Sequence, residues 1–244
     1  MKRRTLEALR EARLAGRPVV RALDLSSGEE RLLDPGCKDS PLEGAAADAS
    51  RADRSSMVEV ERRSWFLEVH NPPLDLKIVG AVHIAQPLAR IAALAGYQVS
   101  IIDPRSSFAT ADRFPEVELL HEWPDDALAK SPPGARSALV ALTHDPKLDD
   151  PALAAALRTN CFYIGALGSK KTHAVRLVRL GKLGFTDEEL SRIHGPIGLA
   201  IQARTPAEIA ISILAEMTMR LRADDGWERS VIRATANTGI TPRS

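Results

Sequence analysis

Residues in four short stretches of the chain have the chemistry to bind a phosphorylated small molecule. Glycine turns and free helix amides suit phosphate oxygens, arginine can pair with them bidentately, and histidine can exchange protons. Each stretch lies at the end of an apolar segment. The candidate residues are Gly80, Ala81, Val82, His83, Asp103, Arg105, Thr143, His144, Asp145, Gly165, Gly168, Ser169 and Lys170.

The stretch DLKIVGAVHIAQPLARIAALAGYQVSIIDPR has the outline of a dinucleotide-binding unit: strand, glycine turn, helix and a second strand ending in an acid. Val82 stands where the middle glycine of that signature lets the backbone approach a pyrophosphate, which weakens the prediction of standard NAD binding. Asp103 follows Gly80 at nearly the spacing of a ribose-binding acid. Alternatively, Asp103 begins the DPRSS turn by accepting a backbone amide.

The stretch YIGALGSKKTH runs from an apolar segment through Gly165 and Gly168 into a predicted helix with Ser169 as its N-cap. Lys170 and Lys171 then fall in the first helical turn, where cations oppose the helix dipole by about 0.3–1 kcal/mol each. A bound anion would reverse that penalty through the free amides and the ammonium groups together. The alternative is that both lysines extend into water.

The stretch THDPKLDD places His144 among carboxylates, which makes it a candidate general base or metal ligand. Alternatively, His144 and Asp145 satisfy loop amides. Asp149 and Asp150 are expected to cap the following helix, because Pro151 would then occupy its first position. No Cys/His cluster supports zinc, and no G-x-S-x-G sequence supports a serine hydrolase. The sequence therefore predicts no catalytic set and no metal site.

From Leu74 onward, apolar strand segments such as LKIVGA, YQVSIID, SALVALTHD and CFYIGALG alternate with helical ones. This alternation predicts an α/β fold with a Rossmann-type, doubly wound and mostly parallel sheet. In such sheets a ligand lies beyond the carboxyl ends of the strands, where the four stretches would gather. The capping boxes TDEE at Thr186–Glu189 and TPAE at Thr205–Glu208 predict the starts of two further helices.

Residues 1–73 are predicted to form a short N-terminal α+β segment, and residues 74–244 the Rossmann-type domain. The segment begins with a helix, followed by the strand-like PVVRALDL and a hairpin turn at SSGEE. Residues 36–57 are small and polar without periodicity, which predicts a mobile loop or linker. Strand character resumes in VEVERRSWFLEV and ends at the NPP sequence of residues 71–73, the expected boundary.

The charges nearly cancel, with Lys+Arg 33 against Asp+Glu 32, so composition gives no electrostatic case for binding nucleic acid or a membrane surface. No segment approaches the roughly 20 apolar residues of a membrane-spanning helix, and the N-terminus lacks the apolar run of a signal peptide. The two cysteines, Cys37 and Cys161, suggest neither a metal site nor a disulfide framework. These features predict a soluble, cytoplasmic protein.

An ordered series of motifs over roughly residues 74–220 resembles the xanthine dehydrogenase accessory family (XdhC/CoxI), in the subfamily with GAVHIAQ in its glycine turn. The motifs are GAVHIAQPLA, IIDPRSSFAT, RFP, LTHDPKLDDPAL, YIGALGSKKTH, GPIGL and ARTPAEIAISILAEM. The resemblance implies a Rossmann-type C-terminal domain and a maturation chaperone without turnover of its own. Its implied task is to bind molybdenum cofactor, as molybdopterin or its dinucleotide form, and to assist its sulfuration and insertion.

On this resemblance the candidate residues would bind the molybdenum cofactor, and Val82 belongs to a loop suited to that ligand. The implied partners are the apoenzyme of a molybdenum hydroxylase, of the xanthine dehydrogenase or carbon monoxide dehydrogenase type, and a cysteine desulfurase. A homodimer through the N-terminal segment is a further expectation. The GSAPR-like and GGC motifs of many relatives are absent, so no sulfur-handling role is expected for Cys37.

Two alternatives stay open beside this reading. An NAD(P)-dependent oxidoreductase would use Asp103 to bind the ribose and His144 to transfer a proton. A Mg²⁺-dependent activity on the nucleotide of the cofactor would use Asp145, Asp149 or His144, although the carboxylates already have a capping explanation. NAD(P) is therefore the secondary cofactor expectation.

Overall fold

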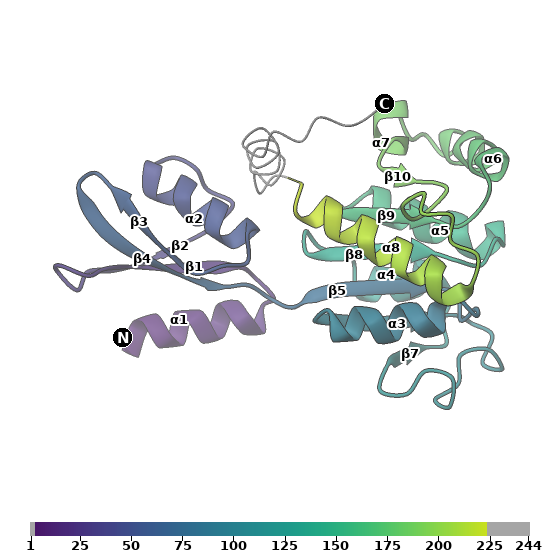
Figure 1. The fold of residues 1–244 in the computed structure, drawn as a ribbon, viewed down its shortest axis with the longest axis horizontal. Helices are drawn as coiled ribbons and strands as arrows, with labels where there is room; N and C mark the ends of the chain where they lie inside the picture. Colours follow the sequence, from purple (N-terminus) through teal and green to yellow (C-terminus); the bar gives the residue numbers. More distant parts are fainter. Residues whose placement is uncertain (1–2, 224–244) are drawn as a thin grey trace, which may run out of the picture. The chain divides into compact units, whose positions relative to one another are not determined.

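The chain forms two units in the computed structural model, which describes residues 3–223 (Figure 1). Contacts within the chain divide it between Pro72 and Pro73. The smaller unit holds the residues up to Pro72 together with Arg222, and the larger unit spans Pro73–Leu221. Each unit has a hydrophobic core of its own.

The larger unit is built on a six-stranded sheet in which every strand pair is parallel. Its strands are β5 (Leu74–Val79), β6 (Tyr97–Ile102), β7 (Glu118–Leu120), β8 (Ser137–Ala141), β9 (Tyr163–Ala166) and β10 (Ile193–His194). Their spatial order is β10-β9-β8-β5-β6-β7, so the direction of winding reverses between β5 and β8. The predicted Rossmann-type, doubly wound fold is confirmed.

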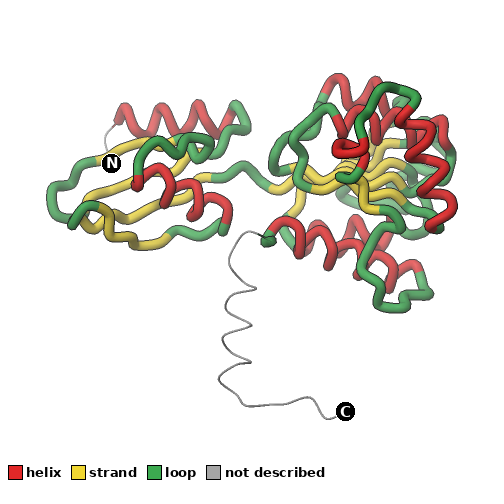
Figure 2. Tube along the Cα trace, turned by 90° about the horizontal axis from the view of Figure 1, so that it is seen from above, coloured by secondary structure: helices red, strands yellow, loops and turns green. Residues whose placement is uncertain are grey.

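Helices cover both faces of this sheet (Figure 2). They are α3 (Ala85–Leu94), α4 (Pro124–Lys130), α5 (Pro146–Leu157), α6 (Lys170–Gly181), α7 (Asp187–Leu190) and α8 (Pro206–Leu221). Helices α3 and α8 pack on one face, whereas α4, α5 and α6 share a core with the other. The capping boxes at Thr186–Glu189 and Thr205–Glu208 are confirmed at the starts of α7 and α8. Within residues 3–223, no helix has both the length and the apolarity needed to cross a bilayer.

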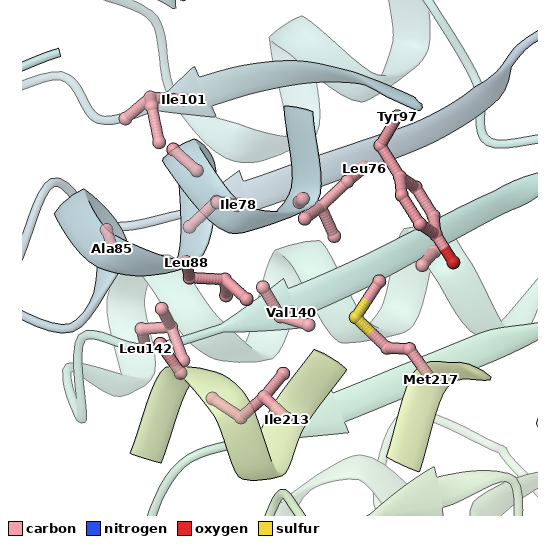
Figure 3. Packing of buried hydrophobic residues seen from close by; sticks show 14 of the residues in the cluster. Leu76, Ile78, Ala85, Leu88, Tyr97, Ile101, Val140, Leu142, Ile213 and Met217 are labelled. Atoms are coloured by element: carbon pink, nitrogen blue, oxygen red, sulfur yellow. The ribbon is translucent and has the colours of Figure 1, made fainter. Parts of the chain in front are cut away.

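Alternate side chains of β5 serve the two faces of the sheet. Leu76 and Ile78 belong to the core formed with α3 and α8, whereas Val79 belongs to the core formed with α4 and α5. Leu88 of α3 and Ile213 of α8 both reach the first of these cores (Figure 3). A strand covered on both faces must be apolar on both, which explains the mainly apolar sequence of β5.

The smaller unit is a four-stranded antiparallel sheet with two helices. Its elements are α1 (Arg3–Leu14), β1 (Val19–Asp24), β2 (Glu30–Leu33), α2 (Pro41–Arg51), β3 (Ser56–Val60) and β4 (Arg63–His70), with strand order β2-β1-β4-β3. Trp65 and Leu67 of β4 form a core with Leu42 and Ala46 of α2. The unit is therefore a helix packed on a sheet, with apolar side chains between them.

The prediction of an irregular segment at residues 36–57 was wrong, because α2 and the start of β3 lie within it. Ser40 caps the helix: its hydroxyl accepts a hydrogen bond from the Glu43 amide at 3.3 Å, and the Glu43 carboxylate accepts one from the Ser40 amide at 2.9 Å. Pro41 occupies the first helical position, and the alanines that follow favour helix. The sequence S-P-L-E was the missed signal of a capping box.

The stretch VEVERRSWFLEV, which reads as strand throughout, is a hairpin in the structure. Val60 pairs with Arg63, and a two-residue turn joins β3 to β4. Glu61 and Arg62 in this turn have φ values of 52° and 61°. Such turns favour asparagine and glycine, so two charged residues at these positions gave the sequence no turn signal.

Candidate functional site

The carboxyl ends of β9, β8, β5 and β6 lie side by side along one end of the parallel sheet. This end of the sheet, with the loops that follow these strands, is called the carboxyl edge below. The loops after these strands contain the candidate residues predicted from the sequence, except Gly165 and Lys170, the first residue of α6. Gly165 lies within β9, where a Cβ atom would overlap Ile197, so packing explains this glycine. The loops after β5 and β8 flank the reversal of strand order, the place where open α/β sheets bind ligands.

Gly80 directly follows β5 and lies against Thr143, the second residue after β8. The φ of Gly80 is 106°, and a Cβ atom at this position would overlap the Cγ2 methyl group of Thr143. Its amide donates to the carbonyl of Ile102 at 2.9 Å. Glycine is therefore required by the backbone conformation and by the close approach of two loops.

Asp103, directly after β6, is fully buried, and both of its carboxylate oxygens are occupied. Oδ2 accepts from the Ala81 amide and from Nη2 of Arg105, each at 2.8 Å, and Oδ1 accepts from the amide and Nε of Arg105 at 3.0 and 2.8 Å. Burial acts to raise the pKa of Asp103, but these hydrogen bonds together outweigh it and hold the pKa below its usual value. The geometry favours the alternative in which Asp103 organises the DPRSS turn.

The guanidinium of Arg105 is engaged bidentately by Asp103, and this hydrogen bonding raises the pKa of Arg105. The same guanidinium lies 4.5 Å from the centre of the Phe108 ring. Val82 is partly buried against the core, whereas His83 beside it is exposed. With its Nε–Nη2 side bonded to Asp103, Arg105 has only the Nη1–Nη2 end of its guanidinium left for pairing with a phosphate.

The loop after β8 turns at His144, whose φ is 64° and whose side chain is exposed. Asp145 is the N-cap of α5, and its carboxylate accepts an amide of the first turn at 2.9 Å. The helix starts at Pro146 rather than Pro151, so the predicted capping by Asp149–Asp150 was wrong. The chain contains two Asp-Pro pairs close together, and the helix uses the first.

Asp149 and Arg176 form a buried ion pair that the sequence analysis missed. Each side chain is 1% exposed, and Nη2 of Arg176 lies 3.4 Å from Oδ2 of Asp149. Oδ1 of Asp149 accepts a hydrogen bond from the Thr143 hydroxyl at 2.6 Å. Burial raises the pKa of Asp149, opposed by the bond from Thr143 and the charge of Arg176. A signal was available, because Arg176 and Leu180 share the buried face of α6.

Arg176 connects this ion pair to the loop after β9. Its Nη2 donates to the carbonyl of Leu167 at 2.8 Å. Its Nε and Nη1 atoms are buried and have no hydrogen-bond acceptor among the residues that the structure describes. Nη1 faces Gly168, 3.9 Å from the position that a Cβ atom of that residue would take. Buried N–H groups without acceptors are uncommon in folded proteins and call for an explanation.

The loop after β9 enters α6 with Ser169 as its N-cap, as predicted. The Ser169 hydroxyl accepts a hydrogen bond from the Thr172 amide at 3.1 Å. Gly168 has a φ of 143°, which favours glycine. Lys170 and Lys171 are exposed in the first helical turn. The start of α6 therefore carries two exposed lysines, and the buried guanidinium of Arg176 lies near Gly168 in the loop before it.

The structure joins the site residues into two groups. A chain of contacts crosses three loops and consists of Gly80, Thr143, Asp149, Arg176 and Gly168. A second group consists of Ala81, Asp103 and Arg105. The first group leaves hydrogen-bond donors unsatisfied among the described residues, whereas in the second both carboxylate oxygens of Asp103 accept hydrogen bonds.

The model of the XdhC Rossmann domain matches residues 76–217, which run from within β5 to within α8 and contain both groups. The chain belongs to the XdhC Rossmann domain family. The family resemblance predicted from the motifs is thus confirmed, and the residues of the carboxyl edge are those of the XdhC domain.

Three relatives of the XdhC domain protein extend this comparison. The molybdenum cofactor insertion chaperone PaoD of Escherichia coli (strain K12) is 34% identical over 157 residues, which cover 63% of this chain and 42% of PaoD. A protein of Bacillus subtilis (strain 168), named as a probable xanthine dehydrogenase subunit, is 27% identical over 222 residues, covering 88% of this chain and 64% of that protein. A solved structure from Bacillus halodurans, described as a xanthine dehydrogenase, matches with a TM-score of 0.66 and 26% identity, covering 91% of this chain and 65% of that one.

The chain spans less than two thirds of the length of each of these relatives. The similarity to the two Bacillus proteins extends beyond the XdhC domain, because each match covers much more of the chain than residues 76–217. The smaller unit is therefore part of what these proteins share.

Proposed function

We propose that this protein binds molybdenum cofactor and acts as an accessory protein in the maturation of a molybdenum hydroxylase, without turnover of its own. Its membership of the XdhC family and the name of PaoD, a molybdenum cofactor insertion chaperone, support this proposal. The name of the Bacillus subtilis relative makes a xanthine dehydrogenase the first candidate recipient. A carbon monoxide dehydrogenase is the second.

The observation that carries the proposal is the buried guanidinium of Arg176 beneath the Gly168 loop, with two of its nitrogens lacking acceptors among the residues described. Molybdopterin ends in a phosphate, and its dinucleotide form contains a pyrophosphate. Phosphate oxygens reaching this loop would give Nη1 an acceptor and would meet the first-turn amides of α6 and the ammonium of Lys170. These residues fit the anionic end of the cofactor.

In this proposal the chain binds and presents the cofactor, and the bound group supplies its molybdenum redox chemistry only in the recipient enzyme. Arg176 is held in position by Asp149 and by the carbonyl of Leu167, so its guanidinium is oriented before the phosphate arrives. Such preorganisation lowers the entropy lost on binding. The exposed His83 and His144, at the ends of β5 and β8, are proposed to face the pterin.

The second group of site residues disfavours the alternative of an NAD(P)-dependent oxidoreductase. A ribose-binding acid must offer a free oxygen to the ribose hydroxyls. Both oxygens of Asp103 already accept bonds from Ala81 and Arg105. Calorimetric titration with NAD(H) and NADP(H) separates the two functions, since micromolar binding lost in Asp103→Ala would favour the oxidoreductase.

We assign the sulfuration step to a partner cysteine desulfurase rather than to this chain. Cys161 is buried, and burial raises its thiol pKa. Cys37 is exposed, but partial desolvation and neighbouring carboxylates raise its pKa as well. A thiol with a raised pKa is a poor nucleophile at neutral pH. The homodimer expected through the smaller unit remains a prediction.

The test is to purify the full chain anaerobically from a molybdenum-replete host and to measure the fluorescent pterin released by oxidation. The wild-type chain should retain pterin, and Arg176→Gln should retain at least tenfold less, because a charge-assisted hydrogen bond contributes about 1.5–3 kcal/mol. Arg179→Gln is the matched control: Arg179 lies on the same helix but pairs with Asp150 at 2.5 and 2.9 Å.

Because Arg176 is buried, Arg176→Gln can also lose pterin by misfolding, so a second pair of variants changes exposed residues instead. Lys170→Ala, at the exposed start of α6, should weaken retention, whereas Lys182→Ala at the exposed end of the helix should not. Thermal melts confirm that each variant is folded. Absence of pterin in the wild-type preparation, together with no binding on anaerobic titration with molybdopterin, would overturn the proposed function.

A further inference from the structure

A polar pocket lies at the other end of the parallel sheet, where strands β9 and β10 begin. Its volume is about 260 Å³. Cys161 precedes β9, Ser191 and Arg192 precede β10, His194 lies in β10, and Arg220 lies in the last turn of α8. Two apolar side chains complete the lining. None of these residues belongs to the carboxyl edge, so the pocket is separate from the proposed cofactor site.

Two arginines give this pocket positive charge; Glu189 interacts electrostatically with Arg192, but neither arginine is in contact with a carboxylate among the described residues. Arg192 donates to three backbone carbonyls, those of Leu157 and Thr159 at 2.8 Å and that of Cys161 at 3.3 Å, which fixes its guanidinium in place. Neither Arg192 nor Arg220 forms an ion pair with any residue between 3 and 223. The fixed guanidinium of Arg192 and the exposed one of Arg220, neither of them in an ion pair with a described residue, suit an anion.

His194 is held at the pocket by the buried carboxylate of Glu216. Nδ1 of His194 lies 3.1 Å from Oε1 of Glu216, and the imidazole stacks on the Tyr163 ring at 4.9 Å with an angle of 17° between the planes. Oε2 of Glu216 accepts from the Tyr163 hydroxyl at 2.5 Å and from the Gly198 amide at 2.7 Å. Because Glu216 accepts only, Nδ1 is the donor in that bond and Nε2 is the nitrogen left for the pocket.

Glu216 is itself satisfied within this network. Its oxygens accept three hydrogen bonds, from Tyr163, His194 and Gly198. Its negative charge is thus directed at these donors, on the side of His194 away from Nε2. A carboxylate that fixes a histidine in this way positions the other ring nitrogen for a ligand.

From this arrangement we infer a binding site for a tetrahedral oxyanion, phosphate or sulfate in class, held between Arg192 and Arg220 with Nε2 of His194 as a further contact. The volume lies just below the roughly 300–1,000 Å³ of pockets for drug-sized ligands, which suits a small anion or the phosphate of a small phosphate monoester. The inference is independent of the proposed cofactor binding.

The test is calorimetric titration of the full chain with inorganic phosphate, inorganic sulfate, glycerol phosphate and acetate at constant ionic strength. Saturable binding of phosphate or sulfate supports the site, and tighter binding of glycerol phosphate identifies a monoester as the natural source. Acetate should bind at least tenfold more weakly than phosphate. Equal binding of acetate and phosphate, or no saturable binding of either inorganic anion at millimolar concentration, would overturn the inference.

Variants locate the site. Arg220 is exposed, so Arg220→Gln should fold normally and should weaken phosphate binding about tenfold or more, the loss of one charge-assisted contact. His194→Gln should also weaken it. Arg204→Gln, an exposed arginine outside the pocket, should bind as the wild type does. Arg220→Gln should retain pterin like the wild type, so failure of this site and failure of the proposed function are distinguishable. Unchanged phosphate affinity in Arg220→Gln would contradict the assignment.

Discussion

The backbone amide of Ala81 donates a hydrogen bond to the buried carboxylate of Asp103 at 2.8 Å. The acid at the end of one strand therefore stabilises the turn at the end of its neighbour, in a place where many Rossmann-type folds direct an acid at a nucleotide. The hydrogen bonds of this turn therefore stabilise the fold. Two buried donors without acceptors among the described residues lie at Arg176, beside the loop after β9.

Asp103→Ala should destabilise the larger unit by about 2 kcal/mol, because it leaves the buried Ala81 amide without an acceptor. Denaturant unfolding at neutral pH measures the change in free energy. Asp112→Ala is the control, since that aspartate is exposed, and its effect should stay within about 0.5 kcal/mol. Full stability in Asp103→Ala would mean that the hydrogen bonds of this turn matter little to the fold.

Gly80→Ala should be strongly destabilising, by about 2 kcal/mol or more, because the new methyl group would overlap Cγ2 of Thr143 and the φ of 106° strains an alanine. Thr143→Ser removes that methyl group and keeps the hydroxyl. The double variant should recover part of the loss, in an unfolding double-mutant cycle. Gly134→Ala is the control, because a Cβ atom there meets nothing within 4 Å. An additive double variant would show that strain alone is responsible.

Asp149→Asn should cost about 3 kcal/mol of unfolding free energy, because it leaves the buried guanidinium of Arg176 without a counter-charge. Arg176→Met alone should destabilise by a similar amount, since Asp149 is then the unpaired charge. Combining the two should cost clearly less than the sum of the single variants. If the costs simply add, the two side chains do not interact as a buried pair.

The stability of the larger unit should fall as the pH drops below about 6.5, in part because of His173. Nδ1 of His173 is buried, and a Cβ atom on Gly195 would overlap it. Burial, aided by the charge of Arg176, lowers the pKa of His173 in the folded state. Between the folded and unfolded pKa values the unfolded chain binds more protons, so acid favours unfolding; above the unfolded value the effect vanishes.

Unfolding free energies of the wild type and His173→Asn, measured from pH 7.5 to 5, test this dependence. The variant should show a shallower loss of stability with acid. His121→Asn, at an exposed histidine, is the control and should keep the wild-type slope. Identical slopes for all three proteins would exclude His173 as a source of acid sensitivity.

Ser40→Ala should destabilise the smaller unit by about 1 kcal/mol, because it removes the hydroxyl that caps α2. Ser40→Asp keeps a side-chain acceptor at the cap and should restore stability close to that of the wild type. Hydrogen exchange of the α2 amides, compared across the three proteins, reports the effect locally. Equal protection in Ser40→Ala and the wild type would show that core contacts alone hold the helix.

Short-range patterns predicted much of this protein. The alternation of apolar strands and helices indicated the Rossmann-type sheet, and the Thr186–Glu189 and Thr205–Glu208 boxes marked two helix starts, because the periodicity and the caps are local. Local reasoning failed at residues 36–57, where the cap at Ser40 went unnoticed. It failed again at α5, where two Asp-Pro pairs compete and only the folded chain shows which one begins the helix.

The order of residues by itself determined the fold class, the family and the loops in which candidate side chains lie. Only the tertiary structure decided which of those side chains are already bonded to one another. The pairing of Asp103 with Ala81 and of Asp149 with Arg176 joins segments far apart in sequence or on different elements. Hydrogen bonds and buried charges depend on distances of a few ångströms in space, and those distances exist only once the strands have been brought side by side.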